Sequence, residues 1–165
     1  MSWQTVLVEG LAYSLGVAVV LMALAKASGP LSQIHNYPHP IYQRALDLGL
    51  VDEDEVRRNR LRYKAIGVVV LAVVPLALVL GVNHARTFWE GFWQAYLIFN
   101  VWSWFDALVV DCGFFCHSRF WVIPGTEDLV DAYHDYWFHL RYAVWGLAFI
   151  AVPAALVGLL AAAVG

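Results

Sequence analysis

Four long apolar stretches constrain the fold of this 165-residue sequence more than any other feature. They cover about residues 3–27, 63–82, 88–115 and 142–164. Each is close to or above the ~20 residues that an α-helix needs to cross the hydrocarbon core of a bilayer. With 61% hydrophobic and 14% charged residues, the chain is also more apolar and less charged than an ordinary soluble domain. The sequence therefore predicts an all-α polytopic membrane protein, with four transmembrane helices forming a single domain over residues 1–165.

The distribution of basic residues predicts how the chain is oriented in a membrane. Nine of the ten Lys and Arg residues lie in or beside two connections, residues 28–62 and 116–141, whereas the connection between the second and third spans holds only Arg86. Basic residues favour the cytoplasmic side. We therefore predict a plasma (inner) membrane protein with its N-terminus and C-terminus outside and connections 28–62 and 116–141 in the cytoplasm. The net charge of −3 provides no basic surface for nucleic acid, so we expect no such partner.

The first two spans each carry one unusual feature. Small residues at the end of the first apolar run, Ala25 to Ser28, are compatible with cleavage of a signal peptide. A signal peptide normally has Lys or Arg before its apolar run, and none precedes this one. We therefore expect the first span to be retained. Pro75 lies in the middle of the second span and is expected to kink it.

Both cytoplasmic connections show patterns typical of amphipathic or interfacial helices. In the first, Ile41, Ala45 and Leu48 recur at helical spacing. Asp52 then fits a capping box that opens a helix leading toward the second span. In the second connection, Thr126 is a predicted N-cap. The helix after it would have an acidic, solvated side and an apolar side, formed respectively by Glu127, Asp131, Asp135 and His139 and by Leu129, Tyr133, Trp137 and Leu140.

Ionisable residues in the third span are the clearest indications of a function, because a charge inside a membrane is costly unless a partner or a role compensates. At about 100° per residue, Asp106 shares a helix face with His117, three turns further along. Asp111 belongs to a second polar stripe, on a different side, with Asn100 and Ser103. These carboxylates either accept hydrogen bonds from other spans or serve a function. For the functional alternative, the candidate catalytic residues are Asp106, Asp111 and His117.

The end of the third span also contains the densest group of potential metal ligands. Thiolate, imidazole and carboxylate groups together can bind zinc or another transition metal. The spacing is not a common zinc pattern, so further ligands would come from the connections, with His35 and His39 as one alternative. The predicted metal set is Cys112, Cys116, His117, His134 and His139. Otherwise, the two Cys residues are small buried hydrophobic residues, which is their usual state.

Two features allow roles in transport or assembly. Glu9 in the first span, like Asp106, is a candidate proton-linked or structural group, although Glu9 is close enough to the outer end to reach water. Small residues four positions apart predict close helix packing or a homodimer. These pairs are Gly10 with Ser14, Ala151 with Ala155, and Ala154 with Gly158.

No segment of the sequence identifies a reaction, a substrate or a cofactor. We carry two hypotheses. The first is a metal-binding protein or an enzyme that acts on a lipidic substrate at the cytoplasmic membrane face. The alternative is a small transporter, or an accessory or assembly subunit, with a membrane-embedded carboxylate.

Overall fold

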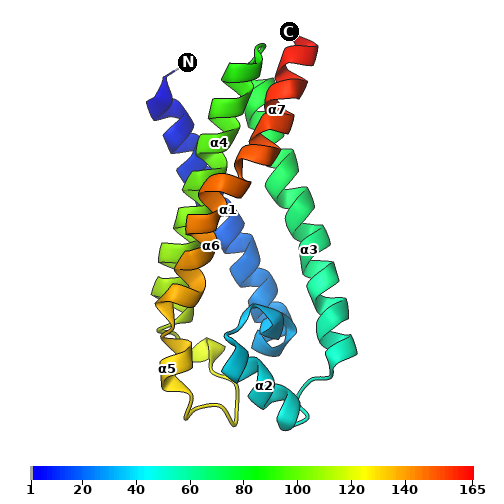
Figure 1. Ribbon diagram of the computed structural model, residues 1–165, viewed down its shortest axis with the longest axis vertical. Helices are drawn as coiled ribbons and strands as arrows, with labels where there is room; N and C mark the ends of the chain where they lie inside the picture. Colours follow the sequence, from blue (N-terminus) through cyan, green and yellow to red (C-terminus); the bar gives the residue numbers. More distant parts are fainter. Residues whose placement is uncertain (1) are drawn as a thin grey trace.

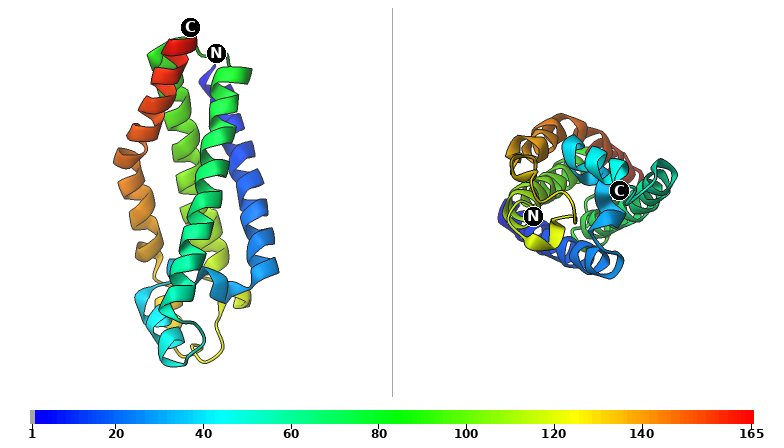
Figure 2. Two further views of the ribbon diagram at one scale, coloured as in Figure 1. Left: turned by 90° about the vertical axis from the view of Figure 1, so that its right-hand side faces the viewer. Right: turned by 90° about the horizontal axis from the view of Figure 1, so that it is seen from below.

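The computed structural model describes residues 2–165, and this part of the chain is entirely helical (Figure 1). Four of its helices are long and apolar enough to cross a membrane: Trp3–Ser28, Glu53–Val82, Phe88–Phe115 and Val130–Val164. The all-α class is thus confirmed, and so are four long apolar helices in the predicted order. Both ends of the chain lie at the same end of the bundle (Figures 1 and 2). We call this the terminal end and the opposite one, where the two long connections lie, the connection end.

Three of the four long helices depart from a simple α-helix. The first is regular throughout, as α1 (Trp3–Ser28). The second is α3 (Glu53–Leu76), which continues as the π-helical η2 (Ala77–Val82) just after Pro75. The third is α4 (Phe88–Phe105), which continues as the π-helical η3 (Asp106–Phe115). The fourth begins with the single turn α5 (Val130–Tyr133) and is then divided into α6 (Tyr136–Phe149) and α7 (Ala151–Val164).

Local chemistry explains where several of these helices begin or break. The Asp52 side chain accepts a hydrogen bond from Glu55 N at 2.7 Å, which confirms the predicted cap. The helix that it opens runs without interruption into the second span, so α3 begins well before the predicted span. Thr87 and Glu90 form a reciprocal capping box at the start of α4. The break between α6 and α7 falls at Ile150 because Pro153, without an N–H, cannot continue the hydrogen bonding there.

Helix α4 is the centre of the terminal end and packs closely against α1 and α7. A Cβ atom added to Gly158 of α7 would lie 2.7 Å from the Phe88 carbonyl oxygen of α4. One added to Gly91 of α4 would lie 2.7 Å from Ala161 Cβ. Gly10 of α1 packs in the same way against Val101. Contacts within one chain therefore account for the small residues at Gly10 and Gly158, and the predicted homodimer stays a prediction.

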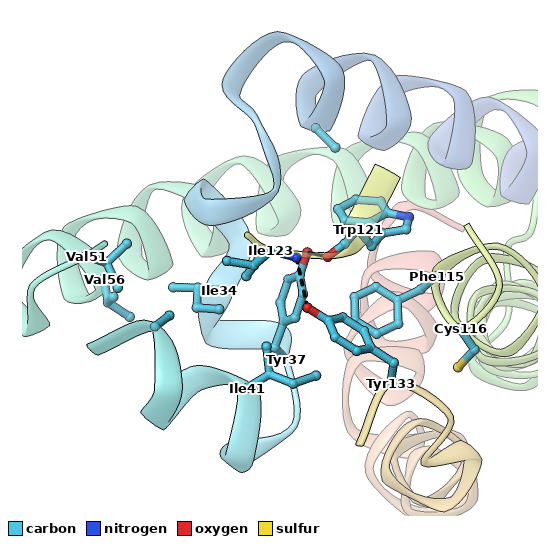
Figure 3. Packing of buried hydrophobic residues seen from close by; sticks show 12 residues of the cluster. Ile34, Tyr37, Ile41, Val51, Val56, Phe115, Cys116, Trp121, Ile123 and Tyr133 are labelled. Carbon is cyan, nitrogen blue, oxygen red and sulfur yellow. Dashed lines mark hydrogen bonds between the residues drawn. The ribbon is translucent and has the colours of Figure 1, made fainter. Parts of the chain in front are cut away.

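The two long connections fold into a compact cap at the connection end. They contain η1 (Pro30–Asn36), α2 (His39–Asp47), η4 (Arg119–Trp121) and α5 (Val130–Tyr133). The predicted helix near Ile41 is confirmed as α2, with Ile41 and Ala45 buried. The buried side chains of the cap form one hydrophobic cluster (Figure 3), which includes Ile34, Tyr37, Ile41, Val56, Phe115, Trp121, Ile123 and Tyr133.

The predicted amphipathic helix after Thr126 is wrong. Thr126 is completely buried, and its hydroxyl donates to the Ile123 carbonyl oxygen at 2.8 Å instead of capping a helix. Only the single turn of α5 follows, and the next helix begins with Asp135 as its N-cap, accepting from Phe138 N at 2.9 Å. Because the helical phase restarts there, His139 does not share a solvated side with Glu127 but is buried, with 5% of its surface exposed.

Candidate functional site

A cavity of about 450 Å³ lies between the long helices at the connection end. Helices α1, α3, η3 and α6 provide its walls, and η1 and η4 contribute from the cap. Its polar lining residues include Gln33, His35, Asn36, Tyr37, Tyr63, Lys64, Asp106, Asp111, His139 and Tyr142. The cavity thus contains two of the three predicted catalytic residues, Asp106 and Asp111.

The π-helix η3 is the reason that Asp106 and Asp111 line the same cavity. In this segment, hydrogen bonds close over five residues, as from Cys116 N to the Asp111 carbonyl oxygen at 3.0 Å. Residues five positions apart are then brought onto nearly the same helix face. The prediction that Asp106 and Asp111 lie on different sides, which assumed an α-helical period, is therefore wrong.

The Asp111 carboxylate lies against the His139 imidazole, in a contact that joins η3 to α6. The distance from His139 Nδ1 to Asp111 Oδ2 is 3.1 Å, and the imidazole lies between the rings of Phe115 and Phe138, each with its centre 5.1 Å away. The second ring nitrogen, His139 Nε2, is buried and has no hydrogen-bond partner. A carboxylate beside Nδ1 favours a proton on that nitrogen and leaves the Nε2 lone pair free. His139, which lines the cavity, therefore holds a buried polar atom without a partner.

An aromatic floor separates the cavity from the cap. It consists of Tyr37, Phe115 and Trp121, which line the cavity and also belong to the buried cluster of the cap (Figure 3). The rings of Tyr37 and Phe115 pack edge to face with their centres 4.8 Å apart, and the Tyr37 hydroxyl donates to the Trp121 carbonyl oxygen at 3.0 Å. Beneath them, the Tyr133 hydroxyl accepts from Ile123 N at 3.0 Å. This packing fixes the position of η1 below the long helices.

The wall opposite η3 is basic and is formed by α3 and η1. Lys64 of α3 lines the cavity and is exposed. Burial, and then the positive charges of Arg60 and Lys64, lower the pKa of His35 below its ordinary value. The Tyr63 hydroxyl lies 3.0 Å from Ser32 Oγ and holds α3 against η1. The cavity therefore has an acidic wall and a basic wall.

The opening of the cavity lies on the side between α3 and α6. The lining residues that are exposed are Asn36 at the end of η1, Lys64 on α3 and Tyr142 on α6. Within residues 2–165, α3 does not pack closely against α6. Because the aromatic floor closes the cavity below, a ligand would enter between these two helices.

The predicted metal ligands are not gathered in one place. His139 lines the cavity, whereas Cys116 is buried in the hydrophobic cluster of the cap. Cys112 is half-buried and belongs to neither. His117 and His134 are exposed, with ring centres 5.4 Å apart, and His117 Nε2 lies 3.1 Å from the Tyr136 hydroxyl. Among residues 2–165, no three His, Cys, Asp or Glu side chains are grouped so that they could hold a metal ion. His117, the third predicted catalytic residue, does not line the cavity that contains Asp106.

Glu9, the other predicted proton-linked group, lies near the terminal end. Its carboxylate accepts a hydrogen bond from Asn83 Nδ2 at 2.8 Å. This contact ties α1 to the chain just after η2 and favours the structural interpretation of Glu9.

No protein-family model, curated protein or solved structure matches this chain. The sequence indicated Asp106, Asp111 and His139 as candidate residues, but Lys64 only as one of the basic residues that predict the orientation. No spacing in the sequence connects Lys64 with Asp106, because only the packing of α3 against η1 brings both to one cavity.

Proposed function

We propose that this protein is a membrane enzyme that performs general acid–base catalysis on a lipidic substrate in the cavity. The observation that carries the proposal is the His139–Asp111 pair, whose Nε2 atom is buried without a partner in a wall of that cavity. Buried polar atoms are rarely left without a hydrogen bond, so an orphan imidazole nitrogen beside a cavity indicates a place for a ligand.

The chemistry follows from the roles that the three side chains can take. His139 Nε2 accepts a proton from a substrate hydroxyl or from an attacking water molecule. Asp111 holds the ring in orientation and stabilises the imidazolium that forms, as a carboxylate does for a catalytic histidine. Asp106, on the same wall, is placed to bind a positive group or to exchange a proton.

The proposed setting is a bilayer in which the long helices span the membrane and the connection end faces the cytoplasm. The four apolar helices support this setting. The accumulation of Lys and Arg at the connection end supports this orientation. The opening between α3 and α6 would then face the lipid, so a lipidic substrate could enter from the side.

The test is a comparison of the wild-type protein with His139→Gln, both purified at full length in detergent and incubated with a total lipid extract. Mass spectrometry of the lipids should show that the wild type converts at least one species. The variant should do so about 10²-fold or more slowly, the usual contribution of a general base. His134→Gln is the matched control, because His134 is exposed and does not line the cavity. The proposal fails if the wild type converts no lipid or if His139→Gln converts it at the same rate.

A proton-linked transporter is the second candidate, and the position of Asp106 favours it. Within residues 2–165, the acidic side chains in close contact with a basic one are Asp128, beside Arg44, and Asp111, beside His139, so Asp106 has no basic partner there. A carboxylate without such a partner within a spanning helix is a typical proton-binding group. In liposomes with a pH gradient and a pH-sensitive dye, this alternative requires that Asp106→Asn slow the dissipation that the wild type produces.

A further inference from the structure

The charged groups that line the cavity are separated by sign. Asp106 and Asp111 belong to η3, whereas Lys64 belongs to α3. Asp111 is paired with His139, but neither Asp106 nor Lys64 takes part in an ion pair within residues 2–165. The cavity thus has one uncompensated acidic group and one uncompensated basic group, on different helices.

A membrane gives this separation a clear energetic meaning. A charge at the level of the spanning helices is costly unless it is paired or reaches water. Lys64 and Asp106 line the same space without meeting, so the two charges are not compensated by each other. A ligand that carried a negative and a positive group at some distance from each other would compensate both at once.

His35 adds a second polar contact to the basic wall. It lines the cavity from η1, and its Nδ1 atom is buried without a hydrogen-bond partner. The charges of Arg60 and Lys64 act on this imidazole together with its burial, and all three lower its pKa and favour the neutral ring. A neutral imidazole beside an ammonium group offers an N–H donor to an anionic oxygen.

The cavity and its opening also have an apolar side. Leu21, Val110 and Phe138 are among the lining residues. Beyond the opening, in the direction of the terminal end, α3 exposes Val68 and Val69, and α6 exposes Trp145. A hydrocarbon chain attached to a bound head group would therefore leave the cavity along an apolar path between α3 and α6.

We propose that the ligand of this cavity is a zwitterionic amphiphile, with its phosphate or carboxylate at Lys64 and His35 and its ammonium group at Asp106. The hydrocarbon chain lies between α3 and α6, in contact with the bilayer. The inference deepens the proposed function, on which it rests, because it names the class of lipid that would meet His139.

Binding of three probes to the purified full-length protein in detergent tests the proposal. A short-chain phosphatidylethanolamine carries phosphate, ammonium and chains; a short-chain phosphatidylglycerol lacks the ammonium group; free phosphoethanolamine lacks the chains. Measured by calorimetry, the first should bind at least tenfold more tightly than either of the others. If phosphatidylglycerol binds as tightly as phosphatidylethanolamine, the proposed ammonium site at Asp106 is wrong. If free phosphoethanolamine binds as tightly, the hydrocarbon chains do not contribute and the ligand is not an amphiphile.

Two substitutions assign the charges to their residues. Lys64→Met and Asp106→Asn should each weaken binding of the phosphatidylethanolamine about tenfold or more. Lys26→Met and Asp131→Asn are the matched controls, because both residues are exposed and do not line the cavity. Unchanged affinity in both cavity variants overturns the proposal. If Asp106→Asn does not fold, Lys64→Met still decides, since Lys64 is exposed and its loss leaves no buried group unpaired.

Binding and turnover separate this inference from the proposed function. Tight, Lys64-dependent binding of phosphatidylethanolamine without any lipid conversion would refute the enzyme and leave the ligand assignment intact. Conversion, dependent on His139, of a lipid that lacks either charge would support the enzyme and refute the zwitterion.

Discussion

The two ends of the bundle are packed in opposite ways. At the terminal end, α4 approaches α7 so closely that Gly91 and Gly158 leave no room for a Cβ atom. At the connection end, the long helices enclose about 450 Å³, and the atoms around this space include buried polar nitrogens without partners. Close contacts at these two glycines stabilise one end, whereas at the other end residues with unpartnered polar nitrogens line a cavity that a ligand or water can occupy. Substitutions at the terminal end should therefore mainly lower stability, whereas substitutions in the cavity should mainly lower activity or ligand binding.

The largest expected effect is on activity, at the connection end. His139→Gln should lower the rate of lipid conversion about 10²-fold or more, because the base is lost. The circular dichroism spectrum should keep its helical shape, since glutamine retains a polar side chain beside Asp111. A variant that lost its helical structure together with its activity would contradict the division between the two ends.

The next effect is on stability, at the terminal end. Gly158→Ala places a methyl group 2.7 Å from the Phe88 carbonyl oxygen, which is backbone and cannot easily move. Overpacking of this kind costs about 1–3 kcal/mol, so the thermal unfolding midpoint in detergent should fall. Gly16→Ala is the control, because nothing lies within 4 Å of the added Cβ. Equal midpoints for the two variants would show that α4 and α7 do not pack as closely as described.

A smaller effect is expected at the aromatic floor. Tyr37→Phe removes the hydrogen bond to the Trp121 carbonyl oxygen, in a residue that is 4% exposed. The loss should destabilise the protein by about 1 kcal/mol. Ligand affinity should fall with it, because Tyr37 lines the cavity as well as the cap. Tyr42→Phe, on the partly exposed side of α2, should change neither the midpoint nor the affinity.

The smallest effect concerns pH. Burial and the charges of Arg60 and Lys64 lower the pKa of His35 in the folded protein below its ordinary value of 6.5. On acidification, the unfolded chain takes up this proton first, so stability falls as the pH drops from about 6.5 toward the lower folded pKa. His35→Asn should remove this part of the fall in midpoint between pH 7.5 and 5.5, whereas His39→Gln should retain it. An unchanged pH dependence in His35→Asn would show that His35 is not in a basic environment.

The sequence predicted the long helices well, because twenty or more apolar residues have few other solutions. Asp52 and Ile41 were also informative, since a cap and a buried helix face depend on neighbours within one turn. The position of Asp106 and Asp111 on one helix face was not predictable, because it depends on a π-helical segment that no residue type in the sequence predicts. His139 was recognised as a polar group of interest but was placed on a solvated side. That error began at Thr126, whose hydroxyl turns back to Ile123 and ends the expected helical phase.

Pro75 lies far enough from Lys64 along α3 that a small rotation at the proline would displace Lys64 by a large distance. Regular α-helical bonding ends just after this buried proline, and Lys64 lies eleven residues before it on the same helix, a distance of about 16 Å at the usual rise. A rotation of about 10° at that point moves Lys64 by roughly 3 Å, close to the width of a water molecule. In the bilayer that we propose, the aperture between α3 and α6 would then change with small changes in the tilt of α3. Lateral pressure and bilayer thickness act on the tilt of spanning helices, so the lipid itself would help to set the width of the entrance.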